Sequence, residues 1–265
     1  MGERQALDIN SMQFKSLKIR GGEAVYLGSL DSNKALVFIG RSSTTKSSAP
    51  LQELINRLVH ENYLLLWPID RTHSIVKLLT KKSERFVRWL DIIFGPDESF
   101  VKDCLRKFAK STILAFYPSK WDHFYMRERK LSLPSQIDFY RRTLRSVLRD
   151  KAVSILSHSA GGRIAAHLCD EPNVERMICF GYPFRHPEKP EESERTDNLR
   201  GIQKPFLIIQ GVQDEYGGKD VASRYELSPC IEFEFVASDH NYENMSDVEW
   251  SAIVDRIESF LNPLH

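Results

Sequence analysis

Short, mainly apolar runs recur along the 265-residue chain and predict the strands of a central sheet. Each run holds five or six residues and is bounded by polar or turn-forming residues, which is typical of strands buried on both faces. The runs lie at 35–39, 63–67, 152–156, 176–180, 205–210 and 231–236.

Two further strand-like runs precede these, at 14–20 and 23–30, on either side of Gly21-Gly22. Two glycines between such runs are a hairpin signal, because glycine accepts the positive φ angles of tight turns. We therefore expect an antiparallel pair at one edge of the sheet.

Helical patterns separate most of the strands, at 50–61, 74–94, 134–149, 160–169 and 246–261. Alternation of strands and helices predicts an α/β fold, with a mostly parallel sheet covered by helices on both faces. We expect one domain over residues 1–265. The stretch 71–133 is longer than a single crossover helix requires, so it is predicted to be a helical cap insertion.

A serine stands where one predicted strand turns directly into a helix, in the sequence "SILSHSAGGRIAAHLC". Small residues surround Ser159, with Ser157 before it and Ala160-Gly161-Gly162 after it. Such a turn can hold one side chain in a strained position above the sheet, where it is available as a nucleophile. The alternative is that Ser159 caps an ordinary helix.

An aspartate and a histidine follow later strands in the order that a serine nucleophile needs. Asp214 comes 55 residues after Ser159, in the loop behind "PFLIIQ", and His240 comes 26 residues further, behind "IEFEFV". Asp239 is an alternative acid because it adjoins the histidine. Neighbouring residues of an extended chain point in different directions, so Asp214 is the preferred candidate.

These motifs resemble the alpha/beta-hydrolase superfamily, whose G-x-S-x-G turn is matched at 157–161 with serine in place of the first glycine. The resemblance covers the core from about residue 34 to residue 263, apart from the insertion. "GYPF" at 181–184, "HPEKPE" at 186–191, "QGVQD" at 210–214 and "SDH" at 238–240 are similar to the dienelactone-hydrolase-like branch.

The resemblance implies an alpha/beta-hydrolase fold with Ser159 as nucleophile, Asp214 as acid and His240 as base. It also implies an oxyanion hole of two backbone N–H groups. Ala160 would supply one of them, and the loop after the 35–39 strand the other, from Arg41 or from Ser42. That loop departs from the family pattern, since it reads Ile-Gly-Arg-Ser where a His-Gly pair is common.

The activity implied is that of a serine esterase or thioesterase, which cleaves a carboxylic ester or thioester through an acyl-enzyme. An acyltransferase or peptidase on the same scaffold is one alternative, and a non-catalytic binding member of the fold is another. Inserted helices in this fold commonly cover the active site. We therefore expect Trp121, Phe124 and Tyr125 to line the substrate pocket, although aromatic residues of an insertion can instead pack it onto the core.

Charge is distributed unevenly, although the whole chain carries a net charge of only +1. From Arg71 to Lys151 there are 19 Lys and Arg against 9 Asp and Glu, whereas Asp170 to His265 holds 9 against 20. The two surfaces can neutralise each other, which we favour over a nucleic-acid-binding patch. Alternatively, the basic segment attracts an anionic small-molecule acyl substrate.

The remaining sequence features indicate a cytoplasmic protein without a cofactor. The four cysteines are scattered and have no CxxC pair, as expected of free thiols in a reducing compartment. No run approaches the length of a membrane span, and the first residues lack an apolar signal region. The motifs of zinc sites and of nucleotide-binding loops are missing from the sequence, so no metal and no nucleotide is predicted.

Overall fold

The computed structural model describes residues 14–40, 49–70 and 132–263, with scattered residues between 75 and 116. The predicted helix at 74–94 and the predicted cap at 71–133 fall largely outside these ranges. The other predicted elements are confirmed with small shifts at their ends. In chain order the described strands and α-helices are β1 (Lys15–Ile19), β2 (Gly22–Leu27), β3 (Lys34–Ile39), α1 (Ala49–His60), β4 (Tyr63–Asp70), α5 (Leu133–Val147), β5 (Ala152–His158), α6 (Ala160–Ala166), β6 (Val174–Phe180), β7 (Phe206–Gly211), α7 (Val221–Arg224), β8 (Ile231–Val236) and α8 (Asp247–Leu261). The short helix α7 was not predicted.

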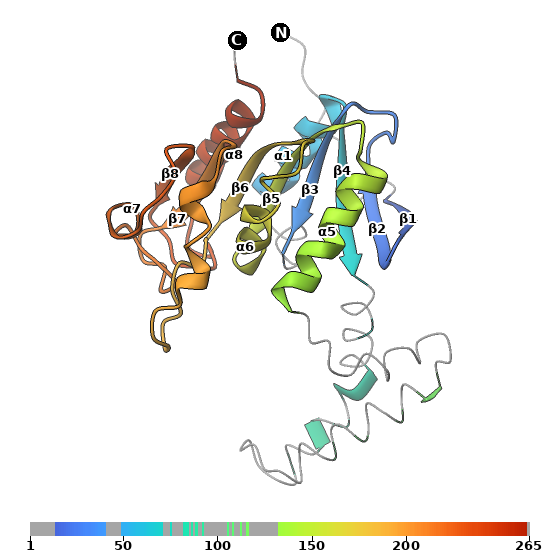
Figure 1. The fold of residues 1–265 in the computed structure, drawn as a ribbon, viewed down its shortest axis with the longest axis horizontal. Coiled ribbons are helices and arrows are strands. Elements are labelled where there is room, and N and C mark those ends of the chain that lie inside the picture. Colours follow the sequence, from blue (N-terminus) through green and yellow to red (C-terminus); the bar gives the residue numbers. More distant parts are fainter. Residues whose placement is uncertain are drawn as a thin grey trace.

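The eight strands form one sheet in the order β1-β2-β4-β3-β5-β6-β7-β8 (Figure 1). Strands β1 and β2 pair antiparallel, and β2 pairs antiparallel with β4. The pairs from β4 across to β8 are parallel. The predicted mostly parallel sheet with a hairpin at its edge is therefore confirmed.

Two details of the antiparallel edge differ from the prediction. The hairpin turn consists of Arg20 and Gly21, because Ile19 already pairs with Gly22. Only Gly21 has a positive φ, 93°, so one glycine is sufficient. Strand β4 also continues past Pro68 to Asp70, because β2 pairs with it over its whole final stretch.

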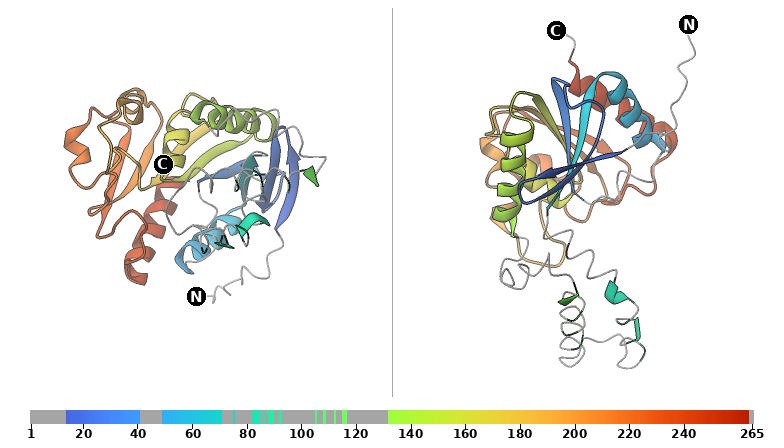
Figure 2. Two further views of the ribbon diagram at one scale, coloured as in Figure 1. Left: turned by 90° about the horizontal axis from the view of Figure 1, so that it is seen from below. Right: turned by 90° about the vertical axis from the view of Figure 1, so that its right-hand side faces the viewer.

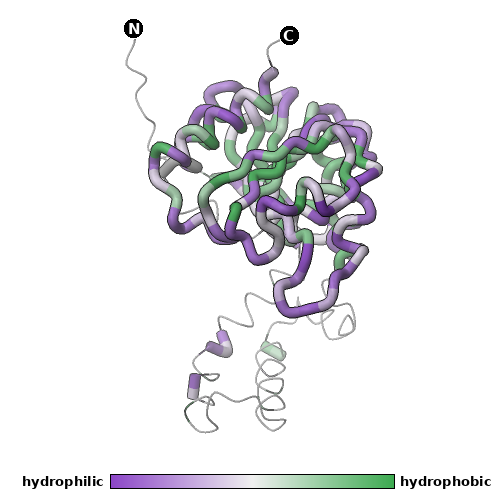
Figure 3. The backbone as a smooth tube through the Cα atoms, turned by 90° about the vertical axis from the view of Figure 1, so that its left-hand side faces the viewer, coloured by the Kyte–Doolittle hydropathy of each residue, from purple (hydrophilic) through white to green (hydrophobic). Residues whose placement is uncertain are grey.

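Side chains alternate between the two faces of the sheet and form two cores. In β3, Ala35, Val37 and Ile39 belong to one core, whereas Leu36 and Phe38 belong to the other. Helices α5 and α6 cover the first face, and α1 and α8 cover the second (Figure 2). Figure 3 shows the apolar positions gathered along the strands between these helices. This layering buries the strands and leaves their carboxyl ends to carry polar side chains.

Ion pairs join the basic part of the sequence to the acidic part. Arg141 and Arg145 of α5 both bind Glu171, at 2.7 and 2.8 Å, and the Glu171 side chain is only 1% exposed. Arg141 also contacts Asp170 at 3.2 Å. Two of the three basic residues of this helix, Arg141 and Arg145, are therefore paired with acidic residues from the C-terminal part of the chain.

Among the described residues, no helix is long and apolar enough to cross a bilayer.

Candidate active site

Ser159 occupies a strained turn between β5 and α6, with φ 51° and ψ −123°. A positive φ is uncommon outside glycine, and it persists here because the surrounding structure fixes the backbone. The Ser159 N–H donates to the carbonyl of Phe180 on β6 at 2.9 Å. Its side chain makes no capping hydrogen bond to α6. Ser159 therefore stands at the N-cap position of α6, but its side chain does not cap the helix.

The turn depends on small residues beneath it. A Cβ atom on Gly161 would lie 2.3 Å from the carbonyl oxygen of Ile39, and one on Gly162 would lie 2.4 Å from Cys179 Sγ. Ser157, in place of the usual glycine, is buried, and its hydroxyl donates to the carbonyl of Ile178 at 2.8 Å. A serine is therefore accommodated at this buried position, because a carbonyl group of β6 accepts the hydrogen bond of its hydroxyl.

His240 lies between the serine and an aspartate in a chain of hydrogen bonds. Its Nε2 is 2.8 Å from Ser159 Oγ, and its Nδ1 is 2.8 Å from Asp214 Oδ2. Asp214 and His240 are buried, at 3% and 7% exposure, whereas Ser159 is half-buried. An ionised carboxylate only accepts hydrogen bonds, so the proton of the bond between His240 and Asp214 lies on Nδ1. The neutral imidazole then presents the Nε2 lone pair to the serine hydroxyl.

The carboxylate of Asp214 is itself held by two further donors. Its Oδ1 accepts the N–H of Tyr216 at 2.8 Å, and its Oδ2 accepts Nε2 of Gln210 at 2.9 Å. The carboxylate of Asp239 binds its own loop instead, because its Oδ1 accepts hydrogen bonds from the backbone N–H groups of Asn241 and Tyr242. The acid that the structure brings to His240 is therefore Asp214.

Two neighbours define the position of the imidazole ring. The ring of Tyr216 lies 4.5 Å from that of His240, centre to centre, at 40°. Directly after β6, Gly181 has φ 58°, and a Cβ there would lie 3.0 Å from His240 Nδ1. The ring therefore packs against an aromatic side chain and against a backbone position that has no side chain.

The other predicted site residues are described only in part. Ala160 is exposed as the first residue of α6, where a backbone N–H has no preceding helical carbonyl to bind. Arg41 and Ser42 lie outside the described residues. So do the predicted pocket residues Trp121, Phe124 and Tyr125.

Sequence reasoning missed the roles of Gln210, Tyr216 and Gly181 around the Asp–His pair. Gln210 carried a signal, because it is a polar residue at the end of an otherwise apolar strand, "FLIIQG". A buried amide is retained only where its hydrogen bonds are satisfied, so its place beside the predicted acid could have been noticed.

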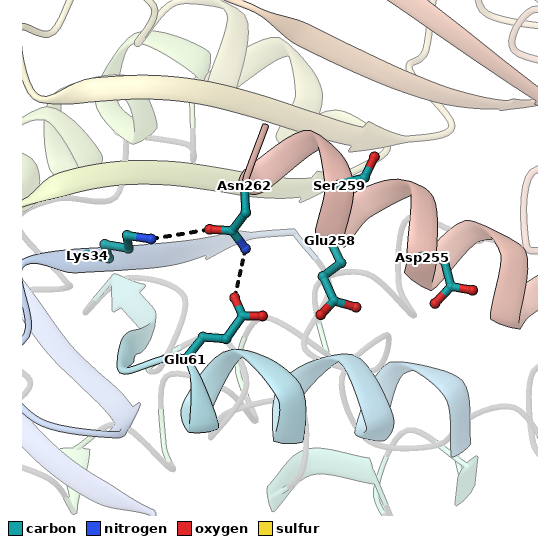
Figure 4. Close-up of a pocket in the computed structure, with 6 residues that line it drawn as sticks. All are labelled: Lys34, Glu61, Asp255, Glu258, Ser259 and Asn262. Carbon is teal, nitrogen blue, oxygen red and sulfur yellow. Dashed lines mark hydrogen bonds between the residues drawn. The ribbon is translucent and has the colours of Figure 1, made fainter. Parts of the chain in front are cut away.

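An open groove of about 560 Å³ lies at the other end of the strands, near the residues that begin β3 and precede β4. Figure 4 shows the side chains that line it. Asn262 accepts Lys34 Nζ at 3.2 Å and donates to Glu61 at 2.7 Å, so these lining groups bind one another. The groove is separate from the Ser159 site. Its lining residues are Lys34, Glu61, Asp255, Glu258, Ser259 and Asn262.

The described part of the chain holds no cluster of three or more His, Cys, Asp or Glu side chains that could bind a metal ion. The Cys179 thiol beneath the serine turn is fully buried, and this burial raises its pKa to about 12. The thiol therefore stays protonated at neutral pH, and the thiol form is a poor nucleophile.

No curated protein has a matching sequence. An esterase of Pyrococcus furiosus aligns with a TM-score of 0.54 and 12% identity, over 95% of this chain and 92% of that one. The esterase domain of a Rhodothermus marinus protein aligns with a TM-score of 0.53 and 14% identity, over 94% and 98% of the two chains.

A third solved structure, described as a predicted CIB-like hydrolase from Thermoplasma acidophilum, aligns with a TM-score of 0.54 and 16% identity, over 94% and 99% of the two chains. At these identities the likeness concerns the fold. The family model described as an alpha/beta hydrolase domain matches residues 95–260, which is more than half of the chain. This chain therefore belongs to the alpha/beta hydrolases.

Proposed function

We propose that this protein is a serine hydrolase that cleaves a carboxylic ester or thioester through an acyl-enzyme intermediate. The observation that carries the proposal is the unbroken chain from Ser159 Oγ through both nitrogens of His240 to Asp214, with 2.8 Å at each bond. A nucleophile, its base and an orienting carboxylate within hydrogen-bond reach of each other are what acyl transfer requires.

In the first half-reaction Ser159 Oγ attacks the acyl carbon and its proton passes to His240 Nε2. The tetrahedral intermediate places negative charge on the former carbonyl oxygen. The N–H of Ala160 is one donor to that oxyanion, and the loop at Arg41 or Ser42 supplies the other. Collapse breaks the bond to the leaving group, which departs as an alcohol or thiol with the proton from His240.

Water completes the cycle by the same route in reverse. His240 takes a proton from water as the oxygen attacks the acyl carbon, and the acid product leaves when Ser159 regains its proton. Throughout, Asp214 holds the Nδ1–H tautomer and stabilises the imidazolium that forms twice per turnover. Its burial and its two further donors suit it to this task.

The finer assignment rests on sequence motifs. The "GYPF", "HPEKPE", "QGVQD" and "SDH" segments favour the dienelactone-hydrolase-like branch, and segment 71–133 is assigned as a cap whose Trp121, Phe124 and Tyr125 line the acyl pocket. Cysteines 169, 179 and 230 are free thiols. This suits a cytoplasmic enzyme acting on a small acyl substrate without a cofactor.

Labelling with a fluorophosphonate tests the proposal without knowledge of the substrate, because the reagent modifies only an activated serine. The wild-type protein should be labelled, and Ser159→Ala should not be. A matched control is Ser223→Ala, which changes an exposed serine in α7 and should be labelled like the wild type. Ester turnover in Ser159→Ala should fall by about 10⁶-fold. Labelling that persists in Ser159→Ala, or an unlabelled wild type, contradicts the proposal.

A further inference from the structure

Gln210 is a fully buried side chain whose hydrogen bonds all converge on the candidate active site. It lies one residue before the end of β7. Its Nε2 donates to Asp214 Oδ2 at 2.9 Å and to the Gly217 carbonyl at 2.6 Å, and its Oε1 accepts the Tyr182 N–H at 3.0 Å. Both amide hydrogens and the amide oxygen are therefore engaged.

The oxygen that Gln210 contacts is the one that also receives the proton of His240. Asp214 Oδ2 accepts both His240 Nδ1 and Gln210 Nε2. A neutral donor in this place stabilises the negative charge of the carboxylate without cancelling it. An arginine or lysine would compete with the imidazolium for the same charge, and a carboxylate would repel it. Glutamine is thus suited to keep the acid ionised and correctly turned.

The amide oxygen of Gln210 holds the backbone against which the His240 imidazole packs. Tyr182 N–H, held by Gln210 Oε1, directly follows Gly181, whose backbone packs against the His240 ring. The bond to the Gly217 carbonyl holds the far end of the loop that carries Asp214. One side chain therefore connects the end of β6 to both ends of the acid loop.

We propose that Gln210 is a positioning residue for catalysis, which orients Asp214 and His240 and supports the charge on Asp214. The inference rests on the proposed function, since it assumes that Ser159 is the nucleophile. A side chain that only fills space or stabilises the fold would not influence the reactivity of Ser159 in a protonation-dependent way.

The first test removes the hydrogen bonds and keeps the length of the side chain. Gln210→Met should slow fluorophosphonate labelling of Ser159 about 10- to 100-fold, the range for losing a partner that orients a functional group. The matched control is Gln213→Met, which makes the same substitution on an exposed side chain three residues further on and should label within about 2-fold of the wild type. Thermal unfolding of both variants is recorded alongside.

The second test makes the donor titratable. In Gln210→Glu the introduced carboxyl can donate to Asp214 only while it is protonated, and burial beside a second carboxylate raises its pKa. Once ionised it repels Asp214. The labelling rate of Gln210→Glu, divided by that of the wild type at the same pH, should therefore fall as the pH rises. The same ratio for Gln210→Met should be independent of pH.

The outcomes separate this inference from the proposed function. An unlabelled wild type overturns both. A labelled wild type, together with a folded Gln210→Met that labels at the wild-type rate, overturns the role of Gln210 alone. If Gln210→Met does not fold, the isosteric Gln210→Glu decides: a ratio that falls with pH supports the positioning role, and a flat ratio overturns it.

Discussion

Replacing Asp214 by asparagine isolates the value of one negative charge in this site. Asparagine has the same shape but only one acceptor oxygen. Among the described residues, two donors, His240 and Gln210, bind Oδ2, and one, the Tyr216 N–H, binds Oδ1. The amide oxygen of Asp214→Asn should therefore take the Oδ2 position. In that orientation the Nδ1–H tautomer of His240 is kept, and the NH₂ group of the asparagine faces the Tyr216 N–H, so that two donors oppose each other.

The expected loss then follows from the charge. With the Nδ1–Oδ2 contact at 2.8 Å, the charge centres of the carboxylate and the imidazolium are about 4 Å apart. At an effective dielectric constant of about 20 their attraction is about 4 kcal/mol. The loss of this attraction in the transition state corresponds to about a 10³-fold fall in kcat/KM. The opposed N–H groups should also lower the free energy of unfolding by about 1–3 kcal/mol.

The assay is hydrolysis of a short-chain p-nitrophenyl ester, with the fluorophosphonate labelling rate as a second readout. Asp239→Asn is the control, because the Asn241 and Tyr242 N–H groups that Asp239 binds can be bound equally by an amide oxygen. It should keep kcat/KM within about 3-fold. A loss in Asp239→Asn as large as that in Asp214→Asn, or a loss below about 10-fold in Asp214→Asn, refutes the assignment of the acid.

Three other outcomes are expected. Gly161→Ala should lower the free energy of unfolding by about 1–3 kcal/mol in urea denaturation, because its Cβ meets a backbone oxygen at 2.3 Å, whereas Gly201→Ala, with nothing within 4 Å, should be close to neutral. Glu171→Gln should lower the free energy of unfolding by about 2 kcal/mol in the same measurement, since it weakens three charged hydrogen bonds to two arginines. An unchanged midpoint would contradict that pairing. If the basic segment 71–151 steers anionic substrates, kcat/KM for an anionic ester should exceed that for a matched neutral ester and lose this preference with added salt; equal salt responses would leave the segment without that role.

Much of the fold was predictable because local patterns and burial agree. A strand covered on both faces must be apolar along its length, so the runs at 35–39 and 152–156 are visible without any alignment. The Ser159 turn was visible for a similar reason, since close packing of a helix on a strand admits only small residues. Its partners followed from the chain order Ser, Asp, His, with each of the last two residues in a loop after a later strand.

The missed features depend on pairing between distant segments. The continuation of β4 through Pro68 requires β2 as a partner, and no local pattern states which strand lies next to which. Gln210 is similar, because its value comes from Tyr182, Asp214 and Gly217 and not from its sequence neighbours. A single buried polar residue is compatible with many partners. Its role therefore becomes clear only when the sheet is assembled.

The register of the sheet explains why one histidine can join a serine and an aspartate from strands that are not neighbours. Phe180 on β6 is level with His158 on β5 and with Ile209 on β7. The next residues along these strands are Ser159, Gly181 and Gln210, so they form one row at the carboxyl edge. Adjacent strands lie about 4.8 Å apart, which leaves a gap of about 10 Å between β5 and β7. The imidazole spans this distance by packing against the backbone just after β6. A side chain at Gly181 would collide with the ring, so glycine at this position leaves room for it.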